Sequence, residues 1–348
     1  MNAAIFAFTE RGKATARRIA GILDIRARYA PARLSGEDFS AYTGALPEFA
    51  GRVFDRDALV FVGAAGIAVR AIAPHVASKR TDPAVLCVDE AGQFVIPILS
   101  GHIGGANRLA RLLAEALGAV PVITTATDVN GRFSVDAWAA EQGMAITSMA
   151  LAKRVSAEIL VRDIPFFTDA PRPRRLAEGL VWADSGKLGV CVSTRDIRPF
   201  DDTLLLAPRA LRLGIGCRRG APEGAIGAAV ERVFSENHLR LEAVRAAASI
   251  DVKADEAGLT AYCRKMGWPV AFYSATQLSA VPGRFTPSVF VQNTVGVDNV
   301  CERAAAAEGG RIIVKKTALD GVTVAVAEQE WGVDFGEDSR GGHRPRRL

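Results

Sequence analysis

The 348-residue sequence has few cysteines, few histidines and few aromatic residues. Its five cysteines are scattered and contain no C-x-x-C pair, so neither a disulfide framework nor a zinc site is indicated, and we expect core thiols. No run of about 18 apolar residues occurs, which argues against a membrane span. The first residues lack the basic start and apolar core of a secretory signal, so a cytoplasmic location is expected.

Motifs for nucleotides and nucleic acids are also missing. Neither G-x-G-x-x-G nor G-x-x-x-x-G-K-[ST] occurs, so a nucleotide-dependent α/β enzyme is the least favoured hypothesis. The formal net charge is +5, but basic residues are spread out and aromatic residues make up only 7%, so no nucleic-acid partner is predicted. A polycarboxylate small molecule fits this positive surplus better.

The most informative stretch that is present runs from Leu99 to Asn107, between an apolar run and an amphipathic run. This order predicts a strand, a glycine turn and a helix whose first N–H groups suit a carboxylate or an oxyanion. His102 in the turn is a candidate for proton transfer, with the amides of Gly104 and Gly105 as oxyanion donors. The same pattern also occurs in tight connections whose histidine merely caps or packs.

Strands alternating with helical runs predict an α/β protein. We expect an N-terminal domain with a mostly parallel sheet (1–146), a small middle or linker domain (147–210), a C-terminal mixed α/β domain (211–331) and a disordered tail (332–348). Ligands of such sheets lie at the carboxyl ends of strands. The polar groups that follow predicted strands are therefore expected to converge on one edge, namely those of 63–66, 89–90, 100–102 and 124–128.

Several distinct phrases occur in order in the first and third of these domains. They are Gly66–Pro74, Asp82–Val85, Val88–Glu90, Leu99–Asn107, Pro121–Asp128, Gly214–Arg218, Ser249–Lys253 and Thr294–Ala304. Together they resemble the CbiG family of cobalt-precorrin-5A hydrolases, and the C-terminal part alone resembles CobE.

This resemblance implies a hydrolase of anaerobic cobalamin biosynthesis that opens the δ-lactone of cobalt-precorrin-5A and releases acetaldehyde, giving cobalt-precorrin-5B. It implies a tetrapyrrole polycarboxylate substrate, no separate cofactor and no protein metal site, since the cobalt arrives in the substrate. Transient contact with neighbouring corrin-pathway enzymes is a further possibility. The alternative is a non-catalytic carrier of a corrinoid intermediate, which the CobE-like part keeps open.

Candidate site residues follow from the chemistry that lactone opening needs. His102, Asp89 and Glu90 are the candidates for proton transfer. Candidates for binding the substrate are Arg70, Lys79, Ser100, Gly101, Gly104, Gly105, Asn107, Thr124, Thr125, Asp128, Lys253, Glu256, Glu302 and Arg303. Arg70 is the leading carboxylate clamp, because a guanidinium binds carboxylates in a fixed two-pronged geometry. Lys253 with Glu256 also reads as an ordinary surface pair three residues apart.

Overall fold

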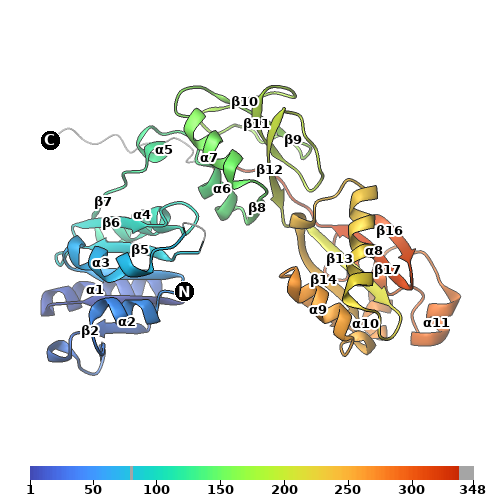
Figure 1. The fold of residues 1–348 in the computed structure, drawn as a ribbon, viewed down its shortest axis with the longest axis horizontal. Coiled ribbons are helices and arrows are strands. Elements are labelled where there is room, and N and C mark those ends of the chain that lie inside the picture. The colour runs from blue at the N-terminus through green and yellow to red at the C-terminus, as the bar shows by residue number, and fades with distance from the viewer. Residues whose placement is uncertain (79–80, 337–348) are drawn as a thin grey trace. The chain divides into compact units, whose positions relative to one another are not determined.

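The computed structural model describes residues 1–78 and 81–336 (Figure 1). Within them, residues 1–140 form one compact unit and residues 141–336 a second. The second unit contains both the predicted middle domain and the predicted C-terminal domain. Lys79 and the tail from residue 337 onward lie outside the described residues. No helix of the described ranges is long and apolar enough to cross a membrane.

The first unit is a seven-stranded sheet in the order β3-β2-β1-β4-β5-β6-β7. Its strands are β1 (Ala3–Ala7), β2 (Ala27–Ala30), β3 (Ser40–Ala41), β4 (Ala58–Val62), β5 (Ala84–Val88), β6 (Phe94–Leu99) and β7 (Val120–Pro121). Five of its six strand pairs are parallel, which confirms the expected mostly parallel α/β architecture. The apolar run 120–123 contributes only its first two residues to the sheet, as β7.

Helices cover both faces of this sheet. They are α1 (Glu10–Leu23), α2 (Leu46–Arg52), α3 (Ala65–Ile72) and α4 (Ala106–Leu117), and two short helices, α5 (Ala126–Val129) and α6 (Val135–Glu141), follow β7 in the chain. Apolar residues of α1 and α4 pack with one set of alternating strand side chains, and those of α2 and α3 with the other set. β1, β4 and β5 are buried at every position for this reason, and they therefore read as uninterrupted apolar runs.

The β5–β6 pair is antiparallel, and this corrects the expectation of a single polar edge. Residues 89–93 form a short turn between the two strands, in which the Asp89 carboxylate accepts hydrogen bonds from the N–H groups of Ala91, Gln93 and Phe94. Because β6 runs backwards and β7 is parallel to it, the segments 100–102 and 124–128 lie at the opposite edge from 63–66 and 89–90.

The second unit begins with a five-stranded sheet in the order β10-β9-β11-β12-β8. Its strands are β8 (Met144–Ile146), β9 (Ile164–Thr168), β10 (Leu180–Trp182), β11 (Leu188–Val192) and β12 (Asp202–Pro208), and α7 (Met149–Glu158) accompanies them. The segment expected to be a small linker domain therefore has a sheet of its own, parallel except for β8.

The third sheet has the order β15-β14-β13-β17-β16. Its elements are β13 (Leu211–Cys217), α8 (Glu223–Glu236), β14 (Val244–Ile250), α9 (Ala257–Lys265), β15 (Val270–Tyr273), α10 (Ala275–Ala280), α11 (Val289–Val295), α12 (Cys301–Ala306), β16 (Arg311–Leu319) and β17 (Val322–Glu328). β16 and β17 form a hairpin that turns at Asp320-Gly321, because Asp-Gly is a strong sequence signal for a two-residue turn, and both turn residues have positive φ.

The chain after β17 returns to the middle sheet. The Gln329 N–H donates to the Ala210 carbonyl at 2.9 Å, Val333 is buried, and the Phe335 ring contacts Phe166 with 5.5 Å between centroids. Residues 332–336, the described start of the expected tail, thus contain no helix or strand but are partly packed.

Candidate functional site

Two groups of candidate residues lie at opposite edges of the N-terminal sheet. The first edge is at the carboxyl ends of β1, β4 and β5. The chain leaves β1 for β2 on one side and later enters β4 on the other, so the strand order reverses between β1 and β4. Open α/β sheets bind ligands at such a switch point.

Arg70, Asp89 and Glu90 belong to this first edge. Val62 and Val88 are register partners and the Gly63 N–H donates to the Val88 carbonyl, so the chain segments that follow β4 and β5 leave the sheet side by side. Arg70 is exposed, and its guanidinium reaches back to Gly66 in the first turn of α3. α3 begins after Ala64 without a side-chain cap, and the Ile67 N–H donates to the Ala64 carbonyl, so the N–H groups of Ala65 and Gly66 are the ones without a partner among the described residues.

The two acidic candidates differ in what their carboxylates do. Asp89 is used by the turn described above, whereas the half-buried Glu90 has no side-chain hydrogen bond or ion pair among the described residues. Glu90 is fixed through its backbone, whose carbonyl accepts from the Thr15 hydroxyl at 2.7 Å. Glu90 is therefore the acidic candidate of this edge whose carboxylate has no partner among the described residues.

His102 lies at the other edge, between two carboxylates. Its Nε2 is 3.0 Å from Asp128 Oδ2 and its Nδ1 is 3.0 Å from Asp136 Oδ1, while the Ser134 hydroxyl is also 3.0 Å from Nδ1. Arg111 binds the second oxygen of Asp128. Two cations and two carboxylates thus balance one another in this group.

These contacts determine the charge of His102. Burial by itself lowers the pKa of His102, but the hydrogen bonds and negative charges of Asp128 and Asp136 outweigh it and raise the pKa to about 9. Burial likewise raises the pKa of Asp128, yet His102 and Arg111 hold it below its ordinary value. At neutral pH the histidine is an imidazolium, which cannot accept a proton from water or from Ser134.

The glycine turn is closed by its own backbone hydrogen bonds. The Gly105 N–H donates to the His102 carbonyl, and the N–H groups of the next two residues donate to Ser100 and Gly101. A Cβ at Gly104 would lie 2.4 Å from the Ser100 Cβ, so the glycine here permits tight packing. The Gly105 amide is thus already paired in this conformation and is not open to an oxyanion.

The remaining candidates near this turn join the same network. Asn107 donates to the Thr125 hydroxyl at 2.9 Å and to Asp128 at 3.0 Å, and the Ser100 hydroxyl donates to the Asp82 carbonyl. Thr124 is exposed.

Sequence reasoning missed Asp136, Ser134 and Arg111 as members of this group. The available signals were a serine two residues before an aspartate at a helix start, and an arginine one turn after Asn107.

The C-terminal candidates are paired within the protein. Lys253 Nζ lies 2.8 Å from Glu256, whose other oxygen accepts from the Gly220 N–H. Glu302 is buried and accepts from two backbone N–H groups, and Arg303 binds Asp298 at 2.6 Å. These four residues hold loops in place in this conformation.

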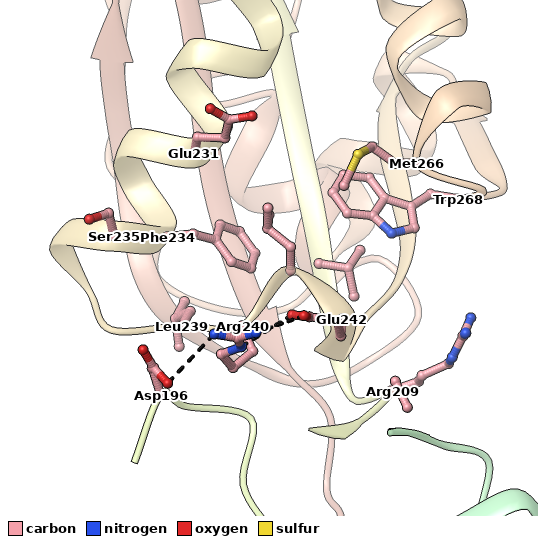
Figure 2. Close-up of a pocket in the computed structure, with 13 residues that line it drawn as sticks. Asp196, Arg209, Glu231, Phe234, Ser235, Leu239, Arg240, Glu242, Met266 and Trp268 are labelled. Atoms are coloured by element: carbon pink, nitrogen blue, oxygen red, sulfur yellow. Dashed lines mark hydrogen bonds and ion pairs between the residues drawn. The ribbon is translucent and has the colours of Figure 1, made fainter. Parts of the chain in front are cut away.

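A pocket of about 610 Å³ lies in the second unit. Figure 2 shows the side chains that line it. Phe234, Met266 and Trp268 contribute apolar surface, and Arg240 is bound to Asp196 and Glu242. Its charged lining residues are Arg209, Arg240, Asp196, Glu231 and Glu242. Carboxylates outnumber guanidinium groups there, so the pocket does not suit a polycarboxylate.

Comparison with known proteins extends the similarity across the chain. Residues 48–128 match the family described as Cobalamin synthesis G N-terminal, and residues 211–327 match Cobalamin synthesis G C-terminus. The chain is 34% identical over 339 residues to the cobalt-precorrin-5A hydrolase of Salmonella typhimurium strain LT2, covering 93% of this chain and 96% of that protein.

Two further relatives agree with this. The cobalt-precorrin-5A hydrolase of Priestia megaterium is 32% identical over 293 residues, which cover 77% of this chain and 78% of that protein. Protein CobE of a Sinorhizobium species is 34% identical over 125 residues, covering 35% of this chain and 81% of CobE. The chain is thus a member of the CbiG family of cobalamin synthesis proteins, with a C-terminal region similar to CobE.

Proposed function

We propose that this protein is a cobalt-precorrin-5A hydrolase, which opens the δ-lactone of its substrate and releases acetaldehyde to give cobalt-precorrin-5B. The observation that carries the proposal is the 34% identity to a cobalt-precorrin-5A hydrolase over nearly the full length of both chains. A cytoplasmic location and transient contact with neighbouring pathway enzymes remain predictions.

The reaction has two chemical steps. Water adds to the lactone carbonyl and the ring C–O bond breaks, which leaves a carboxylate and an alcohol. The alcohol then loses its proton, a C–C bond breaks to give acetaldehyde, and the conjugated macrocycle takes up the electron pair and a proton. The protein must supply a base, hydrogen-bond donors for the oxyanion and cations for the carboxylate arms.

The switch-point edge of the N-terminal sheet supplies groups of these kinds. In the proposal Arg70 binds a carboxylate arm, Glu90 removes the proton from water, and the uncapped first turn of α3 stabilises the oxyanion. His102 does not act as the base in this proposal, because it is protonated and both of its ring nitrogens have carboxylate partners. This reverses the sequence-based preference for His102 over Glu90 as the base.

The direct test is to incubate the purified protein with cobalt-precorrin-5A and trap acetaldehyde. The expected result is stoichiometric acetaldehyde and loss of the lactone. Tight binding of an intact lactone without acetaldehyde supports the carrier instead, an alternative that the CobE-like region keeps open.

A further inference from the structure

The segment between α10 and α12 is held at its base by buried polar side chains. Glu302 is 1% exposed, and its two oxygens accept from the N–H groups of Thr286 and Lys316, each at 2.8 Å. Asn299 is fully buried, donates to the Thr286 carbonyl and accepts from the Glu302 N–H. One carboxylate thus ties this segment to β16.

Arg303 fixes the other side of the base. Besides Asp298, it donates to the carbonyls of Leu278, Ser279 and Val281, and its guanidinium lies 4.7 Å from the centroid of the Phe285 ring. The segment between α10 and α12 is therefore held near both of its ends.

The part of the segment beyond these anchors exposes large apolar side chains. Val289 and Phe290, in the first turn of α11, are 77% and 78% exposed. α11 stands at the margin of the C-terminal sheet in Figure 1. Exposing a phenylalanine so fully on an anchored segment leaves apolar surface in water for a partner to cover.

Two cations accompany this apolar tip. Arg284 is exposed and lies two residues before Thr286. Lys316 lies in β16 beside Thr286, because the N–H groups of these two residues donate to the same carboxylate, that of Glu302. Neither forms an ion pair with any described residue.

We propose that Arg284, Val289, Phe290 and Lys316, here called the α11 surface, bind the ring of a corrinoid polycarboxylate. The apolar side chains cover a face of the flat ring, and the two cations bind its carboxylate arms. This inference rests on the proposed function for its ligand. The α11 surface differs in charge from the pocket in Figure 2. The α11 surface combines unpaired cations with apolar side chains, whereas carboxylates outnumber guanidinium groups in the pocket.

Binding of two cobalt corrinoids to the full chain tests the proposal by titration calorimetry. Cobyrinic acid carries free carboxylate arms, and cobinamide carries the same ring with amidated arms. The double change Arg284→Gln with Lys316→Gln should lower the affinity for cobyrinic acid about tenfold or more and leave the affinity for cobinamide unchanged. The double change Val289→Ser with Phe290→Ser should lower the affinity for both corrinoids about tenfold.

Matched controls are Lys187→Gln and Val161→Ser, which change an exposed cation and an exposed valine of the middle segment and should alter neither affinity. All four surface changes are expected to leave the melting temperature unchanged. Wild-type affinity for both corrinoids in both double variants overturns the α11 surface, even when the wild-type protein releases acetaldehyde. Loss of binding in the variants of a protein that releases none supports the surface and contradicts the hydrolase.

Discussion

At the residue scale, the difference between Glu90 and His102 gives the sharpest prediction. Glu90→Gln should lower the rate of acetaldehyde release by about 10²–10⁴-fold, because the amide cannot accept a proton, with little change in substrate affinity. His102→Gln should cost less, since the imidazolium is already protonated. Single-turnover kinetics with cobalt-precorrin-5A separate the two variants. A larger loss of rate for His102→Gln would identify His102 of the glycine turn as the base and contradict the role of Glu90.

Arg70 is expected to act in binding rather than in turnover. Arg70→Ala should raise KM by a factor equivalent to about 1.5–3 kcal/mol, the range for a hydrogen bond to a charged group, while kcat changes little. Steady-state kinetics measure both parameters, with Lys187→Ala as a control for loss of one exposed positive charge. A fall in kcat at constant KM would contradict the clamp.

His102 also makes stability depend on pH. Its folded pKa of about 9 exceeds the unfolded value of 6.5, so the stabilisation is fully present below pH 6.5 and disappears as pH rises through 9. The difference corresponds to about 3 kcal/mol. Urea unfolding at several pH values should show a gap between wild type and His102→Gln that is largest at low pH and closes above pH 9. A gap independent of pH would mean that the carboxylates do not hold a proton on His102.

At the element scale, glycines in the C-terminal sheet decide how closely a helix approaches it. A Cβ at Gly214 of β13 would lie 1.7 Å from the Cys301 carbonyl oxygen at the start of α12. Gly214→Ala should therefore lower the free energy of unfolding by about 3 kcal/mol or more, because backbone cannot move aside cheaply.

Gly224 provides the matched control for this prediction. It lies in α8 with nothing within 4 Å of an added Cβ, so Gly224→Ala should stabilise the protein by up to about 1 kcal/mol. Equilibrium unfolding in urea measures both variants. Equal effects of the two changes would show that α12 is not packed on β13 as described.

At the scale of the whole molecule, the positive net charge should assist capture of a polyanionic substrate. The formal charge is +5, so the protein attracts a polycarboxylate electrostatically, and dissolved salt screens this attraction. Raising the ionic strength from about 0.05 M to about 0.5 M should raise KM severalfold and leave kcat nearly constant. KM independent of salt would indicate that apolar contacts dominate binding.

The sequence by itself determined the α/β class, the alternation of strands and helices and the Asp-Gly hairpin, because these depend on local periodicity and turn chemistry. It also carried the family resemblance in short phrases along the chain. The tertiary structure decided the direction of β6: a five-residue turn admits an antiparallel return, and that reversal separates Glu90 from His102. It also decided the charge of His102, because Asp128 and Asp136 come from separate helices that only folding brings to the imidazole. Strand direction and the charge of a buried group depend on which distant segments become neighbours, and the pattern of one segment does not contain that information.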